Sequence, residues 1–190
     1  MSLASLYQSH IPTYRHLGYR IPLLISGNTD DNLTTVEALL SQLNLPLSAE
    51  CNALFVGQKK DEHNKKRFNA REAIDAKQYR HYLGHEFDVV IFDGYCGFHV
   101  DALAALSGTV KAGGLFILLM PKADSDAWAA FADPDKKRFS QWQSNTENAP
   151  SYFLVHAHPL LTQQFFHITS SNGELTNIPA VNVESSKNAP

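Results

Sequence analysis

Short apolar runs alternate with longer amphipathic stretches along most of this chain. A continuous apolar run of about 4–8 residues is typical of a buried strand, whereas apolar residues spaced three and four apart indicate a helix. Strands that alternate with helices are joined by right-handed crossovers, which predict a parallel sheet covered on both faces. The pattern therefore predicts an α/β fold: an open, mostly parallel sheet with helices on both faces.

Four apolar runs are the expected central strands, and a fifth closes the sheet; we place them at residues 21–25, 53–56, 87–94, 115–120 and 165–169. Helices are expected at residues 33–43, 69–84 and about 98–107. A capping box of Asn69 and Glu72 would open the second of these helices, and Gly84 would end it. The segment before Asn69 is expected to be a long charged loop.

The pattern is weaker after Pro121. Residues 123–131 and 135–143 are interpreted as short helices, while residues 151–161 fit a helix or an alternating strand, of which we favour the helix. From Ser171 onward the chain is polar. We expect a single domain over residues 1–183, followed by a tail or interdomain linker over residues 184–190.

The size and composition of the chain suit one compact domain. Its 190 residues fall within the usual range of a single domain, and 44% of them are hydrophobic. The net charge of −3 excludes the basic balance of a free-standing nucleic-acid binder, so an RNA contact would have to come from a local patch. The N-terminus shows no secretory signal and no apolar run is long enough to span a membrane, so we expect a cytoplasmic protein without membrane partners.

Neither of the two common phosphate-binding glycine motifs occurs in the sequence. The chain has no Gly-x-x-x-x-Gly-Lys-Ser/Thr loop, which would cradle a triphosphate. The first strand is followed by Ser26-Gly27-Asn28-Thr29 instead of the Gly-x-Gly-x-x-Gly of dinucleotide-binding sheets. We therefore expect no cofactor-binding residue in this chain, and we interpret Gly27 as a turn residue.

Two pairs of histidines have spacings that occur among metal ligands. His81 and His85 are four residues apart, and His156 and His158 are two apart. Neither pair has a third ligand nearby in sequence, and His85 lies beyond the helix end expected at Gly84. Ordinary surface or core histidines explain both pairs better, and we predict no metal site.

Cys96 and His99 follow the third strand, at the edge where sites form in parallel sheets. Together they would make a thiolate nucleophile and its base, but the sequence supplies no orienting acid and no recognisable oxyanion turn. We therefore predict no catalytic residue. Asp93, which ends the same strand, either contacts a ligand in the crevice or caps the next turn and helix, and we favour the cap.

Two basic clusters are the candidate RNA contacts. Residues 59–67 carry five basic and two acidic side chains beside the carboxyl end of the second strand, and a smaller cluster covers residues 136–138. Such clusters bind phosphates in nucleic-acid-binding proteins, but they also occur as plain solvated surface. The candidate RNA-binding residues are Lys59, Lys60, Lys65, Lys66, Arg67, Lys136, Lys137 and Arg138.

Residues 92–121 read FDGYCGFHVDALAALSGTVKAGGLFILLMP. This string resembles the N-terminal domain of the TmcA family, the bacterial tRNA(Met) cytidine acetyltransferases, and weaker similarity covers nearly all the rest of the chain. The resemblance implies a Rossmann-like N-terminal domain, followed in the parent protein by a helicase-like ATPase module and an acetyltransferase module.

The parent protein implied by this resemblance acetylates the exocyclic N4 amine of a wobble cytidine, using acetyl-CoA and ATP with Mg²⁺ bound in the later modules. None of the family's catalytic residues maps onto this sequence. The resemblance therefore implies a non-catalytic domain that assists tRNA docking or organises the modules. Its partners would be tRNA(Met) and, within the same protein, the ATPase and acetyltransferase modules.

Two other functions remain open from the residues alone. Leu106 to Pro121 is similar to the late strand of a methyltransferase that uses S-adenosylmethionine. Such an enzyme would have a glycine-rich first loop and an acidic residue at the end of the second strand, where this chain has Gly57-Gln58-Lys59. A protein-interaction scaffold is the other alternative, and the sequence does not separate it from an RNA-docking domain.

Overall fold

The computed structural model describes residues 3–43, 51–58, 61–122, 124–131, 152–171 and 173–179. Within these ranges the chain forms a seven-stranded sheet of order β3-β2-β4-β5-β1-β6-β7. All neighbouring strands are parallel except β6 and β7, which are antiparallel. The strands are β1 (Ile21–Gly27), β2 (Ala53–Gly57), β3 (Glu72–Asp75), β4 (Phe87–Asp93), β5 (Val110–Pro121), β6 (Phe166–Thr169) and β7 (Glu174–Asn177).

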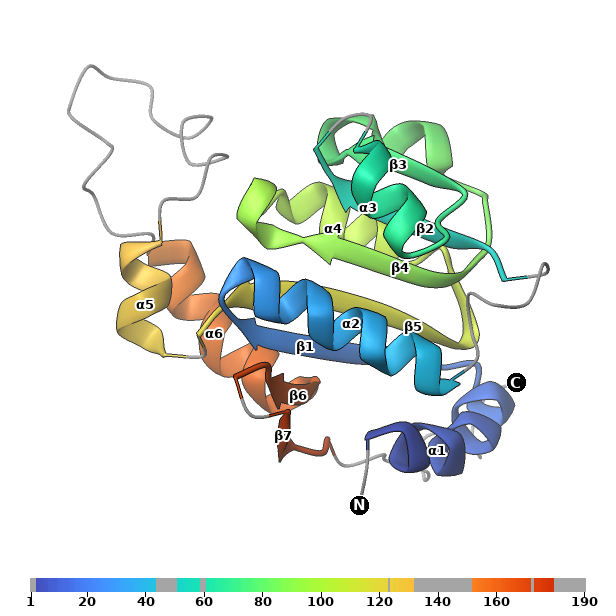
Figure 1. The fold of residues 1–190 in the computed structure, drawn as a ribbon, viewed down its shortest axis with the longest axis horizontal. Helices are drawn as coiled ribbons and strands as arrows, with labels where there is room; N and C mark the ends of the chain where they lie inside the picture. The colour runs from blue at the N-terminus through green and yellow to red at the C-terminus, as the bar shows by residue number, and fades with distance from the viewer. Residues whose placement is uncertain are drawn as a thin grey trace, which may run out of the picture.

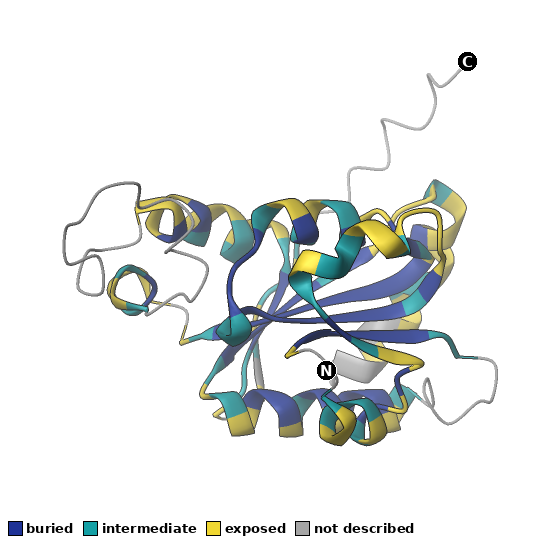
Figure 2. Cartoon of the chain, turned by 90° about the horizontal axis from the view of Figure 1, so that it is seen from above, coloured by how far each residue is buried: buried dark blue, intermediate teal, exposed yellow. Residues whose placement is uncertain are grey.

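Helices cover both faces of the sheet, as the edge-on view in Figure 2 shows. Helices α1 and α2 pack on one face, whereas η1, α4, α5 and α6 contribute to the core on the other. This arrangement confirms the predicted open, mostly parallel α/β, Rossmann-like fold (Figure 1). The helices are α1 (Leu3–Leu17), α2 (Thr29–Leu43), α3 (Glu62–Arg67), α4 (Val100–Ser107), α5 (Ser125–Ala130), α6 (Tyr152–Gln164) and the 3₁₀ helices η1 (Ala76–Tyr82) and η2 (Gly94–Cys96).

The central strands are apolar on both faces because each face has its own core. Ile117 of β5 belongs to the core beneath α1 and α2, and its neighbour Leu118 belongs to the core beneath α4 and α6. Successive side chains of a strand point to opposite faces, so a strand buried on both sides reads as a continuous apolar run. This is why residues 115–120 could be recognised as a strand from the sequence.

The predicted helix over residues 69–84 is wrong. Asn69 has a left-handed backbone with φ of 46°, and the chain then forms the short edge strand β3, which pairs with β2, before it enters η1. The capping box lies further along: Asp75 accepts from the backbone N–H of Lys77, and the side chain of Gln78 accepts from the backbone N–H of Asp75. Strand pairing with β2 therefore overrode a local helix signal at Glu72.

The expected charged loop after β2 is also corrected in part, because residues 62–67 form helix α3. The strand expected near residue 166 and the helix favoured over residues 151–161 are confirmed as β6 and α6, and the helix expected at 123–131 is confirmed as α5. The polar segment after Ser171 contains β7, which the sequence did not predict because its four residues include a single large apolar side chain. Residues 135–143 and 184–190 lie outside the described ranges.

In the part of the chain that the structure describes, none of the helices combines the length and the apolar character needed to cross a membrane.

Candidate functional site at the carboxyl edge of the sheet

Two crevices are expected at the carboxyl edge of the sheet, where neighbouring strands lead to opposite faces. From β1 the chain continues into α2 on one face, and from the neighbouring β5 it continues into α5 on the other. In the same way, β2 leads to α3 and the neighbouring β4 leads to η2 and α4. Ligands of open α/β sheets bind at such points, so each crevice is a candidate site.

Protein side chains fill the crevice between β1 and β5. The hydroxyl of Tyr95 lies within hydrogen-bonding distance of the carbonyl oxygens of Gly27 and of Met120, the latter at 3.0 Å. Asn32 is fully buried, and its Nδ2 donates to the Met120 carbonyl oxygen at 2.9 Å. A side chain at position 27 would collide with Ser170. Gly27 therefore allows close packing as well as a turn. In related folds a nucleotide binds after the first strand, and in this domain protein groups close that position.

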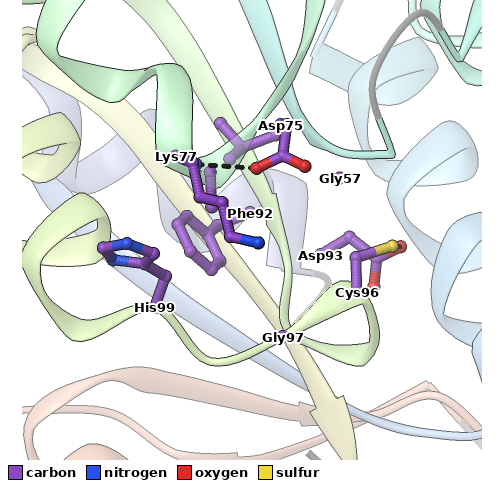
Figure 3. Close-up of a pocket in the computed structure, with 10 residues that line it drawn as sticks. Gly57, Asp75, Lys77, Phe92, Asp93, Cys96, Gly97 and His99 are labelled. Atoms are coloured by element: carbon purple, nitrogen blue, oxygen red, sulfur yellow. Dashed lines mark hydrogen bonds between the residues drawn. The ribbon is translucent and has the colours of Figure 1, made fainter. Parts of the chain in front are cut away.

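The crevice between β2 and β4 contains a pocket (Figure 3). It lies at the ends of β2, β3 and β4, where the chain turns into η1 and η2. Its walls combine apolar and polar groups, including two carboxylates, one ammonium group and one imidazole. The lining residues are Val56, Gly57, Asp75, Ala76, Lys77, Phe92, Asp93, Cys96, Gly97 and His99.

Asp93 caps the turn that follows β4, as the sequence predicted. Its Oδ1 accepts from the backbone N–H of Tyr95 at 3.0 Å, and its Oδ2 accepts from the thiol of Cys96 at 3.2 Å. Burial raises the pKa of the Asp93 carboxyl, and these two hydrogen bonds oppose the rise only in part. Burial, and then the neighbouring Asp93 carboxylate, raise the pKa of the Cys96 thiol to about 12. Near neutral pH Cys96 is therefore a protonated hydrogen-bond donor, which is unsuited to nucleophilic attack.

His99 is the N-cap of α4 and is buried. Its Nδ1 accepts from the backbone N–H of Ala102 at 3.2 Å, which leaves the proton of a neutral ring on Nε2. The ring packs beside Tyr79, with the two centroids 5.8 Å apart. Figure 3 shows His99 and Cys96 on opposite sides of the pocket, with Lys77 between them. The structure thus brings His99 and Cys96 to the same pocket but gives each its own structural partner.

Asp75 and Lys77 line the pocket and were not recognised from the sequence, because they fall inside the incorrectly predicted helix. Asp75 ends β3 directly opposite Gly57 of β2, and its Oδ1 accepts from the Lys77 backbone N–H at 2.8 Å. The carboxylates of Asp61 and Asp75 also contribute to the raised pKa of Cys96. Acidic groups therefore lie on the Cys96 side of the pocket, whose walls also include Lys77.

Three of the eight candidate RNA-binding residues lie in helix α3, which Asp61 caps through the backbone N–H of Asn64. Lys66 is exposed, and Lys65 lies 3.8 Å from Glu62 of the same helix. Arg67 instead links α3 to α2: its Nε donates to Glu37 at 2.9 Å and its Nη2 to Thr34 at 3.1 Å. The other five candidates, Lys59, Lys60, Lys136, Lys137 and Arg138, lie outside the described residues.

The histidine pairs are not assembled into a metal centre in the described ranges. His81 is exposed on η1, and His158 of α6 packs edge-on against Trp128 with 5.0 Å between ring centroids. Among the side chains that the structure describes, no group of three or more His, Cys, Asp or Glu residues is placed to hold a metal ion.

A polar chain that is buried at Ser26 and His167 and reaches the surface at Thr176 joins β1, β6 and β7. Ser26 Oγ lies 2.8 Å from Nε2 of His167, and Nδ1 of the same ring lies 2.6 Å from Thr176 Oγ1. Burial lowers the pKa of His167, so the neutral ring accepts at one nitrogen and donates at the other. A serine beside a histidine is also the arrangement of some nucleophiles, but Ser26 is fully buried. We interpret the chain as a structural tie within the sheet.

The fold and its carboxyl edge define a Rossmann-like α/β domain in which one crevice is closed by protein groups and the other contains a small polar pocket. Residues 1–167 match the family model for the N-terminal part of the tRNA(Met) cytidine acetyltransferase TmcA. The chain belongs to this family.

Individual relatives carry the same name. A TmcA of Nitrosococcus halophilus is 32% identical over 121 residues, which are 64% of this chain and 14% of the relative. A TmcA of Idiomarina loihiensis is 58% identical over 50 residues, 26% of this chain and 8% of the relative. A TmcA of Salmonella typhimurium is 47% identical over 58 residues, 30% of this chain and 8% of the relative. The matched segments are thus a small part of each relative's length.

Proposed function

We propose that this chain is the non-catalytic N-terminal domain of an acetyltransferase that modifies a cytidine of tRNA(Met), and that it assists the docking of the tRNA. The relatives are named tRNA(Met) cytidine acetyltransferases, which supports the substrate. The observation that carries the docking role is helix α3, which presents Lys65 and Lys66 after the carboxyl end of β2. Lys and Arg side chains bind phosphates whatever the base sequence, so this contact would position tRNA without reading it.

Within the basic cluster, the two lysines are better phosphate contacts than Arg67. The guanidinium of Arg67 is held by Glu37 and Thr34, which compete with any phosphate for its donors. The ammonium of Lys65 has one ion pair at the long distance of 3.8 Å, which a phosphate can replace at little cost. We therefore assign Arg67 to the support of α3 and the lysines to the contact.

The absence of catalysis is supported by the chemistry of the carboxyl edge. The crevice at β1 is closed by Tyr95 and Asn32, and the thiol of Cys96 is held in its protonated form by its surroundings. The second pocket places the carboxyl groups of Asp75 and Asp93 beside the single ammonium group of Lys77, so its walls do not provide the paired basic side chains of a phosphate site. We propose that this domain binds neither acetyl-CoA, ATP with Mg²⁺ nor S-adenosylmethionine, and that the first two are bound elsewhere in the longer protein.

Thermal melting of the 190-residue chain tests the cofactor part of this proposal. A ligand present at 100 times its dissociation constant stabilises the folded state by about 2.7 kcal/mol, which raises the melting temperature of a domain of this size by several degrees. We expect no such shift with millimolar ATP, acetyl-CoA or S-adenosylmethionine. A saturable shift with S-adenosylmethionine would favour a methyltransferase-like domain instead.

The docking part is tested by replacing Lys65 and Lys66 with serine in a full-length family protein that carries this domain. The logarithm of the binding constant falls linearly with the logarithm of the salt concentration, and each phosphate-binding charge contributes about 0.7–0.9 to the steepness of that fall. The double variant is therefore expected to bind tRNA(Met) more weakly and with a weaker dependence on salt. The control removes the same charge beside the amino end of β5, with Arg15→Ser and Lys111→Ser, the second of which also breaks an ion pair of 3.0 Å with Asp88. Equal tRNA affinities and slopes for the two double variants would show that α3 is solvated surface.

A further inference from the structure

We propose that the exposed apolar face of helix α6 is a docking surface for an apolar face of the polypeptide that continues beyond this domain in the longer family proteins. The proposal uses the family membership of the chain but does not depend on tRNA docking. Its site is on the other side of the sheet from α2 and involves none of the basic residues.

The solvent side of helix α6 carries large apolar side chains together with the polar residues His156, Gln163 and Gln164. Leu154 and Ala157 are buried toward the core that also contains Trp128. On the exposed side, the exposed fractions are 80% for Tyr152, 49% for Phe153, 37% for Val155 and 54% for Leu160. The helix has no Asp, Glu, Lys or Arg in its 13 residues. Large apolar side chains exposed on a helix without charged residues make that side a candidate contact surface.

Tyr152 and Leu160 share one face of the helix, whereas Phe153 packs against the buried Phe98 of the domain, with the two ring centroids 5.8 Å apart. Tyr152, His156 and Leu160 are four residues apart, so they lie above one another on the same face of the helix. Among the residues that the structure describes, seven large apolar side chains are exposed, and four of them belong to α6. Scattered apolar residues are normal on protein surfaces, whereas such a concentration on one short helix marks an interaction site.

The path of the chain indicates what covers this surface. Strand β7 ends at Asn177, whose Nδ2 donates to the carbonyl oxygens of Gln163 at 2.9 Å and Phe165 at 2.8 Å, at the carboxyl end of α6. Strand β7 therefore ends near the carboxyl end of α6, at the opposite end of this helix from Tyr152. Ile178, the next residue, is a further exposed apolar side chain, with an exposed fraction of 52%.

The relatives have a long polypeptide to place on that surface. The segments that match this chain make up 8–14% of each of the three relatives, so most of the relative lies outside them. A segment tethered beside α6 meets its surface at a high effective concentration and needs only modest intrinsic affinity. The partner face is expected to be apolar where it meets Tyr152 and Leu160, with a polar group opposite His156, which lies between them, and further polar groups near Gln163.

Footprinting of the unaltered proteins tests the covering directly. Hydroxyl radicals oxidise exposed aromatic side chains, so Tyr152 and Phe153 should react readily in the 190-residue chain and several-fold more slowly in a full-length family protein that carries this domain. Tyr19, which is 40% exposed on another part of the domain, is the internal control. Equal oxidation of Tyr152 in the two proteins would overturn the proposal.

A pair of matched variants tests the contact itself. Leu160→Glu places a charge on the proposed surface, and Leu83→Glu places one on a leucine of nearly equal exposure, 51% against 54%, at the end of η1. A charge at the centre of an apolar contact weakens docking by roughly 30-fold or more. In the full-length protein Leu160→Glu should restore the oxidation of Tyr152 and speed proteolytic release of the domain, whereas Leu83→Glu should change neither.

The 190-residue chain provides the remaining comparison. Both variants should leave its melting temperature close to that of the unaltered chain, because neither leucine is buried. Sedimentation of the unaltered chain at micromolar concentration is expected to show a monomer. A dimer that Leu160→Glu dissociates would show that a second copy of the chain occupies the surface, and the proposed occupant would then be wrong.

Discussion

The hydroxyl of Tyr95 donates a hydrogen bond to the carbonyl oxygen of Gly27, a residue 68 positions earlier in the chain. This contact ties the turn after β4 to the end of β1, and it crosses the end of β5, whose Met120 carbonyl oxygen lies 3.0 Å from the same hydroxyl. Three strands are thus joined where an open α/β sheet would otherwise have a ligand crevice. The crevice between β1 and β5 therefore has a structural function in this domain.

Removing this hydroxyl is expected to destabilise the fold. Tyr95→Phe retains the packed ring but loses a hydrogen bond to a backbone carbonyl, which lowers the free energy of unfolding by about 0.5–1.5 kcal/mol. Urea unfolding of the 190-residue chain measures the effect. Tyr152→Phe, which removes a hydroxyl from a ring that is 80% exposed, is the control and should be neutral. If both variants unfold at the same urea concentration, the crevice is not held together by Tyr95.

The sequence predicted the elements whose signal is long and apolar, and missed those defined by tertiary pairing. Strands β4 and β5 are buried on both faces, and their continuous apolar runs identified them correctly. Strand β3 has four residues, lies at the edge of the sheet and depends on its pairing with β2, so the nearby capping signal at Asn69 predicts a helix in its place. Its identity follows from a neighbour that is distant in sequence.

The candidate site was predictable only where a residue acts within its own element. The cap formed by Asp93 could be inferred because the residue ends an apolar run and is followed by a turn. The closure by Asn32 and Tyr95 joins residues 63 positions apart, and no local pattern indicates it. The role of Arg67 likewise depends on Glu37, which comes from another helix. Whether the lysines of α3 bind RNA stays a prediction.

Gly94, directly after β4, lies too close to β5 to carry a side chain. A Cβ there would collide with Met120 and would lie 2.6 Å from the backbone carbonyl oxygen of Leu119. Since a backbone atom of β5 cannot move aside freely, Gly94→Ala is expected to lower the free energy of unfolding by about 1–3 kcal/mol. Gly108→Ala, where the nearest atom lies at 3.2 Å, should be close to neutral in the same urea titration. Comparable losses in the two variants would contradict the crowding at Gly94.

Asp93→Asn is expected to stabilise the domain at neutral pH. Burial raises the pKa of this carboxyl in the folded chain above the value of about 3.9 that it has in the unfolded chain. The protonated carboxyl therefore favours the folded state below a pH of about 3.9, and this contribution to stability is lost as the pH rises through the pKa of the folded chain. Asparagine retains an acceptor for the backbone N–H of Tyr95 but has no charge to desolvate. The difference in unfolding free energy between the variant and the unaltered chain should therefore grow from pH 4 to pH 7.

The control for this pH dependence is Asp126→Asn, which replaces an exposed carboxylate at the start of α5. Its effect on the unfolding free energy should vary little over the same pH range. A loss of stability in Asp93→Asn at pH 7 would show that the carboxylate itself, with its hydrogen bond from Cys96, supports the fold.

The last prediction concerns the reactivity of Cys96. A pKa of about 12 leaves this thiol almost entirely protonated at pH 8.5, whereas a thiol of the unfolded chain with a pKa of about 8.5 is half ionised. The thiolate fraction is then roughly 1,500-fold lower in the folded chain, and the greater nucleophilicity of the more basic thiolate recovers roughly 40-fold of this. Alkylation by iodoacetamide at pH 8.5 should therefore be roughly 40-fold slower at Cys96 of the folded chain than in urea. We would measure it in a Cys51→Ser background, because Cys51 is the second free thiol.

The pH profile of that alkylation separates a high pKa from simple shielding of the sulfur. If the pKa of Cys96 governs the reaction, the rate in the folded chain should rise about tenfold per pH unit between about pH 9 and pH 11, whereas the rate for the urea-unfolded chain should level off above about pH 9.5. Asp93→Asn removes the negative charge that accepts a hydrogen bond from the Cys96 thiol and raises its pKa, so the alkylation profile should shift toward lower pH. A plateau near pH 9 in the folded chain would mean that Cys96 ionises like an ordinary thiol. A reactive thiolate at Cys96 would then be possible in this pocket despite the hydrogen bond to Asp93.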